Sequence, residues 1–103
     1  MGENGGPNGN PASGKKSISS LSQSIVSFGV DPVTGIVAQR DYFQPYNYVA
    51  LSGGDRDMGS SGVVLLDPNP FSGGGVDRVA ICGSKAGVLY VMDADNLGGF
   101  KNG

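Results

Sequence analysis

The 103-residue sequence contains no histidine, no tryptophan and a single cysteine, Cys82. Zinc ions in proteins are held mainly by histidine and cysteine side chains, so these absences exclude a zinc site of the usual kind. Cys82 lies in the apolar run "VAIC", where we expect it to behave as a small buried side chain.

Charge is also scarce, and the formal net charge is −2 with no basic stripe. Nucleic-acid binding depends on lysine and arginine side chains that neutralise phosphates, so we expect no nucleic-acid partner. No apolar run approaches the roughly 20 residues of a membrane-spanning helix. The start, "MGENGGPNGN", lacks the basic and apolar regions of a signal peptide. We therefore expect a soluble chain without a membrane partner, and its compartment stays open.

Strong helix formers do not cluster, and glutamate occurs once, at Glu3. Instead, 19 glycines and 6 prolines make up about a quarter of the chain, well above ordinary usage. The composition predicts one small all-β domain with long Gly/Pro-rich loops.

Short apolar runs between turn residues predict five strands and no helix. Residues 24–30 and 36–43 flank the turn "DPVTG" and predict a hairpin. The run 62–67 predicts a buried strand, and 78–82 with 88–92 predict a second hairpin around "SKA". We expect "QPYNYVALSGG" to be a loop whose tyrosines pack against the sheet, and "ADNLGGFKNG" to contain turns only.

Residues 1–23 are rich in glycine, asparagine and serine, and the first 17 contain no large apolar side chain after Met1. Such a segment cannot bury enough surface to offset its ordering entropy, so we expect a loop or a disordered tail. Its stretch "GNPASGKKS" resembles a phosphate-binding loop, but Lys16 stands where that loop needs a hydroxyl group. We expect no nucleotide site there.

The stretch "GDRDMGSSG" places Asp55 and Asp57 directly before an apolar run. An EF-hand calcium loop needs oxygen ligands at positions 5 and 12, which here are Gly59 and Leu66, so that interpretation fails. Asp55 and Asp57 either cap a turn or belong to a functional site. Lys85, at the tip of the second hairpin, is either solvated or part of the same site.

A weak internal repeat relates "IVSFGVDPVTG" to "VLYVMDADNLG". Both contain a strand, an aspartate, a turn and a glycine, which places Asp31 and Asp93 in matching positions. Repetition of a strand-plus-turn unit favours repeated blades over a single sandwich.

The order of these pieces resembles the quinoprotein, or PQQ-like, β-propeller family. "DRDMGSSGVVLL", a glycine-rich gap and "DRVAICGSKAGVLYVMDADNLGG" are similar to its acidic turn and its G-x-K-x-G-x-x-Y-x-x-D hairpin. "VDPVTG" is similar to the turn that ends a blade's third strand, and "NGNPASG" to a Gly-Asn loop. The matching residues are Asp55, Asp57, Gly59, Ser60, Ser61, Gly83, Lys85, Gly87, Tyr90 and Asp93. The likeness is specific over residues 55–98 and loose before residue 24.

The resemblance implies a partial β-propeller of antiparallel blades, in which residues 24–103 form the last two strands of one blade and the first three of the next. Propellers close with about four to eight four-stranded blades. The resemblance therefore implies a fragment that is inactive as an isolated chain. Its partners would be the remaining blades, or further copies contacted through exposed strand edges.

In cofactor-binding members, the resemblance implies Asp57 as the base and Lys85 as the cation on the quinone, both at one end of the sheet. Asp55 would stand beside them in the cofactor site, and Asn8 would bind calcium. PQQ and calcium would then be cofactors of the full-length parent, with none expected for this chain alone. The family's blade-docking tryptophan and vicinal cysteines have no counterpart here. A non-catalytic repeat segment that serves as a scaffold is one alternative, and a small secreted β-domain unrelated to propellers is another.

Overall fold

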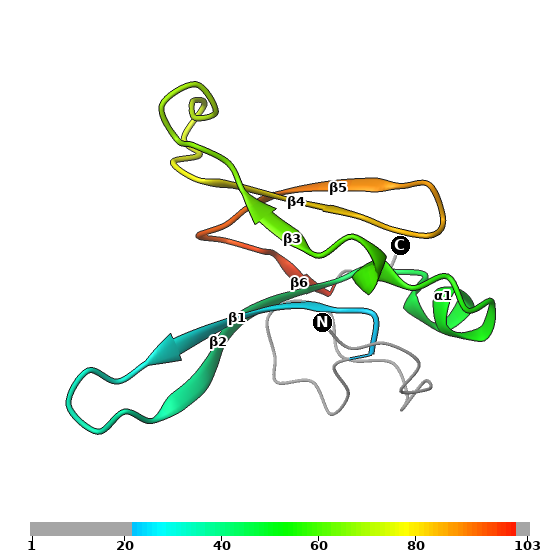
Figure 1. The fold of residues 1–103 in the computed structure, drawn as a ribbon, viewed down its shortest axis with the longest axis horizontal. Helices are drawn as coiled ribbons and strands as arrows, with labels where there is room; N and C mark the ends of the chain where they lie inside the picture. The colour runs from blue at the N-terminus through cyan, green and yellow to red at the C-terminus, as the bar shows by residue number, and fades with distance from the viewer. Residues whose placement is uncertain (1–21, 101–103) are drawn as a thin grey trace.

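The computed structural model describes residues 22–100 as two small three-stranded β-sheets that share a core, with one short helix at one end (Figure 1). The first sheet has the order β1–β2–β6, and the second has the order β3–β4–β5. The bounds are β1 Ile25–Val30, β2 Val37–Gln44, α1 Tyr48–Gly53, β3 Val63–Leu65, β4 Val79–Gly83, β5 Leu89–Asp93 and β6 Gly99–Phe100. A 3-10 turn, η1, spans Met58–Ser60.

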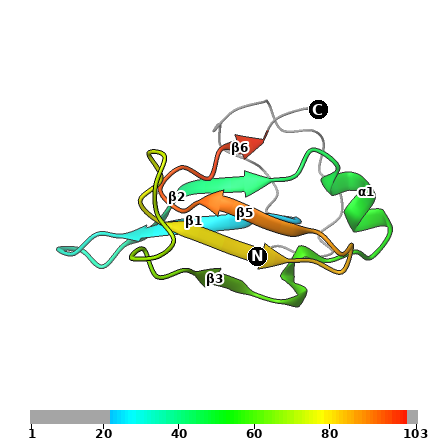
Figure 2. The same ribbon diagram turned by 90° about the horizontal axis from the view of Figure 1, so that it is seen from above.

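The prediction of an all-β chain is confirmed, since the described part consists mostly of strands with little helix. Both predicted hairpins are present: β1 pairs with β2 and β4 pairs with β5, each antiparallel. The β1–β2 register shifts between Ser27 and Phe28, which marks a bulge. β3 joins β4 antiparallel, so β3, β4 and β5 form a three-stranded meander (Figure 2).

The prediction that the chain contains no helix is wrong, because "QPYNYVALSGG" includes α1. The helix follows a turn in which the Tyr48 N–H donates to the Pro45 carbonyl at 3.0 Å. Tyr48 and Leu51 are three residues apart, so they share one helix face, and both are buried. The Tyr48 ring packs edge-on against Phe100, with ring centres 5.9 Å apart. Tertiary contact therefore stabilises a helix that is too short to form alone.

Two further strand predictions need correction. Phe100 belongs to β6, which pairs in parallel with the end of β2, although the segment was expected to contain turns only. The run 62–67 was expected to be buried, but all three residues of β3 are exposed. Continuous apolar runs are typical of strands covered on both faces, and the sequence does not reveal that β3 ends its sheet and pairs only with β4.

The main hydrophobic core lies between the two sheets. Ile25 of β1 shares it with side chains of β4, β5 and the connecting segments, which are Met58, Ala80, Cys82, Met92 and Leu97. Burial of Cys82 is thus confirmed, and desolvation raises the pKa of its thiol. Its Sγ–H donates to the Met58 carbonyl at 3.3 Å. A second cluster, on the first sheet, contains Tyr42, Tyr48 and Phe100.

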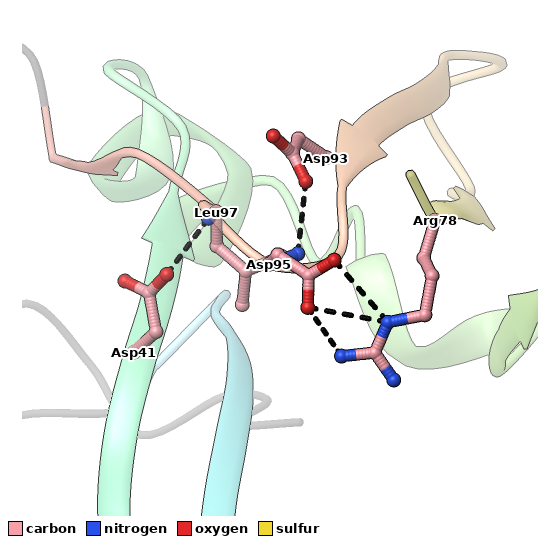
Figure 3. Close-up of polar contacts among 5 residues, drawn as sticks. All are labelled: Asp41, Arg78, Asp93, Asp95 and Leu97. Atoms are coloured by element: carbon pink, nitrogen blue, oxygen red, sulfur yellow. Dashed lines mark hydrogen bonds and ion pairs between the residues drawn. The ribbon is translucent and has the colours of Figure 1, made fainter. Parts of the chain in front are cut away.

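The segment after β5 crosses from the second sheet to the first and is held by charged side chains (Figure 3). Asp41 of β2 accepts the Leu97 N–H at 2.8 Å through Oδ2. Arg78, beside β4, pairs with Asp95 through Nε, 3.2 Å from both carboxylate oxygens, and through Nη2. These contacts position Leu97 in the core between the sheets.

Three aspartates at or just after strand ends make the same turn. In each case Oδ1 accepts the backbone N–H two residues further on, which is the Asx turn that aspartate favours. The donor–acceptor pairs are Val33 to Asp31 at 2.8 Å, Asn69 to Asp67 at 2.9 Å and Asp95 to Asp93 at 2.9 Å. Asp31 and Asp93, the matching positions of the internal repeat, therefore both form Asx turns, although Asp31 also accepts the Thr34 N–H.

The β1–β2 turn gives a test through Asp31, whose carboxylate accepts the N–H groups of Val33 and Thr34. These bonds lower the pKa of Asp31 below its ordinary 3.8. A carboxyl group with a lowered folded-state pKa contributes stability above pH 3.8, which is lost as the pH falls through the folded value. In an NMR titration, we expect the Val33 and Thr34 amide shifts to move together with a midpoint below pH 3.8. Asp31→Asn should abolish that titration, and a midpoint of 3.8 or higher would contradict the turn.

Candidate functional site

The structure brings together the two residues to which the resemblance assigns catalysis. Lys85 Nζ lies 2.9 Å from Asp57 Oδ2, although the two residues are 28 positions apart in the chain. The backbone N–H of Lys85 also donates to the Asp57 carbonyl, at 3.1 Å. The β4–β5 turn is therefore fastened to the segment before β3 by both main-chain and side-chain bonds, and both residues lie at one end of the second sheet.

A tight turn presents Lys85. The Gly87 N–H donates to the Ser84 carbonyl at 3.0 Å, and the Ser84 N–H donates to the Val88 carbonyl at 3.0 Å. Gly87 has a φ of 75°, in the left-handed region that glycine adopts without a steric penalty. The turn chemistry of "GSKAG" thus accounts for the place of Lys85 at the hairpin tip.

Asp57 is positioned by its neighbour Met58. The Met58 side chain is fully buried in the main core, and its N–H donates to Gln23 Oε1 at 3.0 Å. These contacts hold the backbone at the start of η1. Sequence reasoning missed Gln23, because no local pattern links it to a residue 35 positions away.

The ion pair is asymmetric in its exposure. The Asp57 side chain is 10% exposed and the Lys85 side chain is 48% exposed. Asp57 Oδ1 is buried and has no hydrogen-bond partner among residues 22–100, so Lys85 supplies the main compensation for this carboxylate within that range. A buried charge without a partner is costly, whereas the ammonium group of Lys85 stays partly hydrated.

Two interpretations that give these residues no functional role are wrong: Asp57 as a turn cap, and Lys85 as a solvated side chain at a hairpin tip. Asp57 makes no side-chain capping bond to η1, so it does not act as a turn cap. Lys85 is not merely a solvated tip, because it is paired with Asp57. Asp55 is more peripheral: its carboxylate is mostly exposed and lies 3.8 Å from Lys85 Nζ, which also donates to the Asp55 carbonyl at 3.4 Å.

Ser61 fastens the start of β3 to the end of β4. Its Oγ accepts the Gly83 N–H at 2.8 Å and donates to the Gly83 carbonyl at 2.9 Å. The hydroxyl group thereby replaces a pair of backbone ladder bonds at the edge of the sheet. Both residues belong to the motif that carries the family resemblance, but only the structure shows that they bind each other.

Only part of the predicted cofactor site lies within the described residues. Asn8, the predicted calcium ligand, lies outside the described residues 22–100. Within that range, no group of three or more His, Cys, Asp or Glu side chains lies together. The Asp57 carboxylate is covered and closed on Lys85. A groove of about 520 Å³ is lined by neither Asp57 nor Lys85. Its lining residues are uncharged and include Phe43, Tyr46 and Tyr90.

Comparison with protein-family models, with curated proteins and with solved structures gives no match for this chain. Between residues 22 and 100, no helix has the length and apolar character needed to cross a membrane.

The asymmetry of the ion pair generates a prediction for stability. Lys85→Met leaves the buried Asp57 carboxylate without its cation, and we expect it to lower the free energy of unfolding by about 2 kcal/mol. Asp57→Asn releases a half-exposed lysine to water and should cost roughly 1 kcal/mol or less. Native-state hydrogen exchange at the Met58 and Lys85 amides measures both variants as free energies of local unfolding, which does not require the whole chain to unfold cooperatively.

The double variant Asp57→Asn/Lys85→Met removes both charges of the ion pair. Because no buried carboxylate is then left without its cation, we expect this variant to be more stable than Lys85→Met alone. Asp55→Asn serves as the matched control and should change stability by less than about 0.5 kcal/mol, because its carboxylate is exposed. If Lys85→Met costs no more than Asp55→Asn, the Asp57 carboxylate does not depend on Lys85.

Proposed function

We propose that this chain is a segment of a quinoprotein-like β-propeller, formed by parts of two adjoining blades. As an isolated chain it has a structural role and no catalytic activity. The observation that carries the proposal is that the second sheet has apolar side chains on both faces, and within the described part of the chain only the β4 and β5 portion of one face is covered.

The register of the sheet defines both faces. Val64 pairs with Ile81, and Ile81 pairs with Val91, so these three side chains form a row across β3, β4 and β5. Leu89 lies on the same face, two residues before Val91. We call these four residues, Val64, Ile81, Leu89 and Val91, the outer face. The alternate residues Ala80, Cys82 and Met92 point the other way, into the core shared with the first sheet.

A sheet that is apolar on both faces is suited to a position between two other sheets. Blades of a propeller occupy such positions, because each one packs against a neighbour on either side. The meander β3–β4–β5 and the hairpin β1–β2 match the strands that the resemblance assigns to two successive blades. In this proposal, further β-structure covers the outer face.

The Asp57–Lys85 pair has a structural task in this proposal. It fastens the β4–β5 turn to the segment that leads into β3, at the same end of the sheet where Ser61 binds Gly83. A carboxylate that is covered and already paired is suited to holding a loop. It is poorly placed to accept a proton from a substrate, because its exposed fraction is only 10%.

The proposal predicts that the isolated chain exposes apolar surface and melts over a broad temperature range. We expect binding of the dye ANS and a non-cooperative thermal transition by far-UV circular dichroism at low micromolar concentration. Val64→Asp, on the outer face, should reduce dye fluorescence, whereas Val49→Asp, on α1, should not. A compact monomer that melts cooperatively and binds no dye would count against a propeller segment.

A second candidate is an oxidoreductase formed by a longer parent protein. It is favoured by one observation: the residues that match the family's base and cation, Asp57 and Lys85, lie side by side. Titration of the full-length parent with PQQ and Ca²⁺ separates the candidates. The oxidoreductase predicts a change in quinone absorbance that Lys85→Met abolishes, and the scaffold predicts no change with either protein.

A further inference from the structure

A groove of about 520 Å³ lies between the two sheets, beside the segment that leads into α1. Its volume falls in the range of roughly 300–1,000 Å³ that is typical of small-molecule sites. Three segments line it: residues 43–47, the start of β5 and residues 97–99. Asp57 and Lys85 are not among the lining residues, so the groove is separate from the ion pair.

Three aromatic side chains line the groove: Phe43 of β2, Tyr46 of the segment before α1 and Tyr90 of β5. The Phe43 and Tyr90 rings come from different sheets, with 5.6 Å between their centres and a tilt of 54°. Tyr46 is 66% exposed, so its ring is available to a ligand. Because aromatic rings attract one another in tilted and offset geometries, this lining favours a ligand that carries an aromatic ring of its own.

Asn47 gives the groove a polar group that helix capping does not use. It stands at the N-cap of α1, where asparagine commonly accepts a backbone N–H, but its side chain makes no capping bond. Asn47 lines the groove instead and is half-buried. A side-chain amide offers two donors and an acceptor oxygen, so it can bond one polar substituent of a ligand.

The other polar side chains of the lining limit what the ligand can carry. The Gln44 side chain donates to a backbone carbonyl at 2.8 Å, and the Tyr90 hydroxyl interacts with Ser84. Among the polar side chains of the lining, Asn47 and Tyr46 remain. A sugar has a hydroxyl group on most ring carbons, and an extended peptide has polar groups at every residue. Either ligand would therefore lose more hydrogen bonds to water than these two side chains replace.

The groove is lined by no charged side chain. A charged ligand would give up its hydration there without meeting an opposite charge, which is costly. We infer that this groove binds a neutral aromatic small molecule. Its ring packs against Phe43, Tyr46 and Tyr90, and one polar substituent bonds the Asn47 amide. The inference goes beyond the proposed propeller segment, because residues of this chain form the site and the remaining blades contribute nothing to it.

Benzamide is the probe, because it combines one neutral aromatic ring with one amide group. In heteronuclear NMR titrations of the full chain, we expect the backbone amide signals of Asn47, Tyr90 and Gly98 to shift. The shifts should saturate with a Kd on the order of 1 mM, as a ligand of this size allows. Benzoate adds a charge and cyclohexanecarboxamide removes the aromatic ring, so each should bind at least about fivefold more weakly. Glucose should cause no shifts at these residues.

Two variants test the ring and the amide separately. Tyr46→Ala removes an exposed ring and Asn47→Ala removes the amide, and each should weaken benzamide binding by about threefold to tenfold. Tyr46→Phe keeps the ring and should bind nearly as tightly as the wild type. Phe71→Ala is the matched control, since Phe71 is also exposed but does not line the groove. Far-UV circular dichroism checks that each variant keeps its fold, and Asn47→Gly replaces Asn47→Ala if that variant unfolds.

The inference is overturned if benzamide causes no saturable shifts up to about 20 mM, well above the expected Kd. It is also overturned if benzoate or glucose binds more tightly than benzamide, or if Phe71→Ala weakens binding as much as Tyr46→Ala. Each of these results leaves the propeller segment standing, because dye binding and broad melting test that proposal without benzamide. Conversely, a compact monomer that melts cooperatively and binds benzamide contradicts the propeller segment alone.

Discussion

The contact between the two sheets is the interaction on which the rest of the structure depends. Ile25 of β1 packs into a core that β4 and β5 line with Ala80, Cys82 and Met92. Two of these three are small, which allows the first sheet to approach closely. The apolar side chains between the two sheets are buried only when the sheets pack together, so each half of the described chain depends on the other to cover its core.

That contact also determines where the polar groups lie. Met58, in the segment before β3, is buried in the core, and its neighbour Asp57 is therefore nearly buried as well. The carboxylate then needs a cation, and the β4–β5 turn supplies Lys85. The family resemblance gives Asp57 and Lys85 catalytic roles, but core packing accounts for their ion pair. Lys85 compensates the Asp57 carboxylate, which is nearly buried because its neighbour Met58 lies in the core.

The same core leaves the second sheet with unequal faces. Over β4 and β5 its inner face is covered by the first sheet, whereas β3, the outer face and the far part of the β1–β2 hairpin keep apolar side chains in water. The chain has only 38% hydrophobic residues, and much of this material lies on surfaces that its own fold does not bury. The propeller proposal is a response to this imbalance, because the remaining blades would supply the covering β-surface.

Local features were predictable from the sequence because their causes are local. Short apolar runs between turn residues indicated five of the six strands in the described part of the chain, and the Asp-containing turns indicated where β1 and β5 end. The buried cysteine followed from the run that contains it. Asp57 and Lys85 were singled out by motif, although nothing local showed that they bind each other.

Only the tertiary structure decided the rest, since the remaining contacts join residues far apart in the chain. Tyr48 stabilises α1 by packing on Phe100. Phe100 in turn is held by β6, which pairs in parallel with the end of β2. The exposure of β3 depends on its position at the end of a sheet, which a run of apolar residues does not specify. Residue patterns along the chain determine which strands and turns form, whereas burial and ion pairing depend on which strands become neighbours.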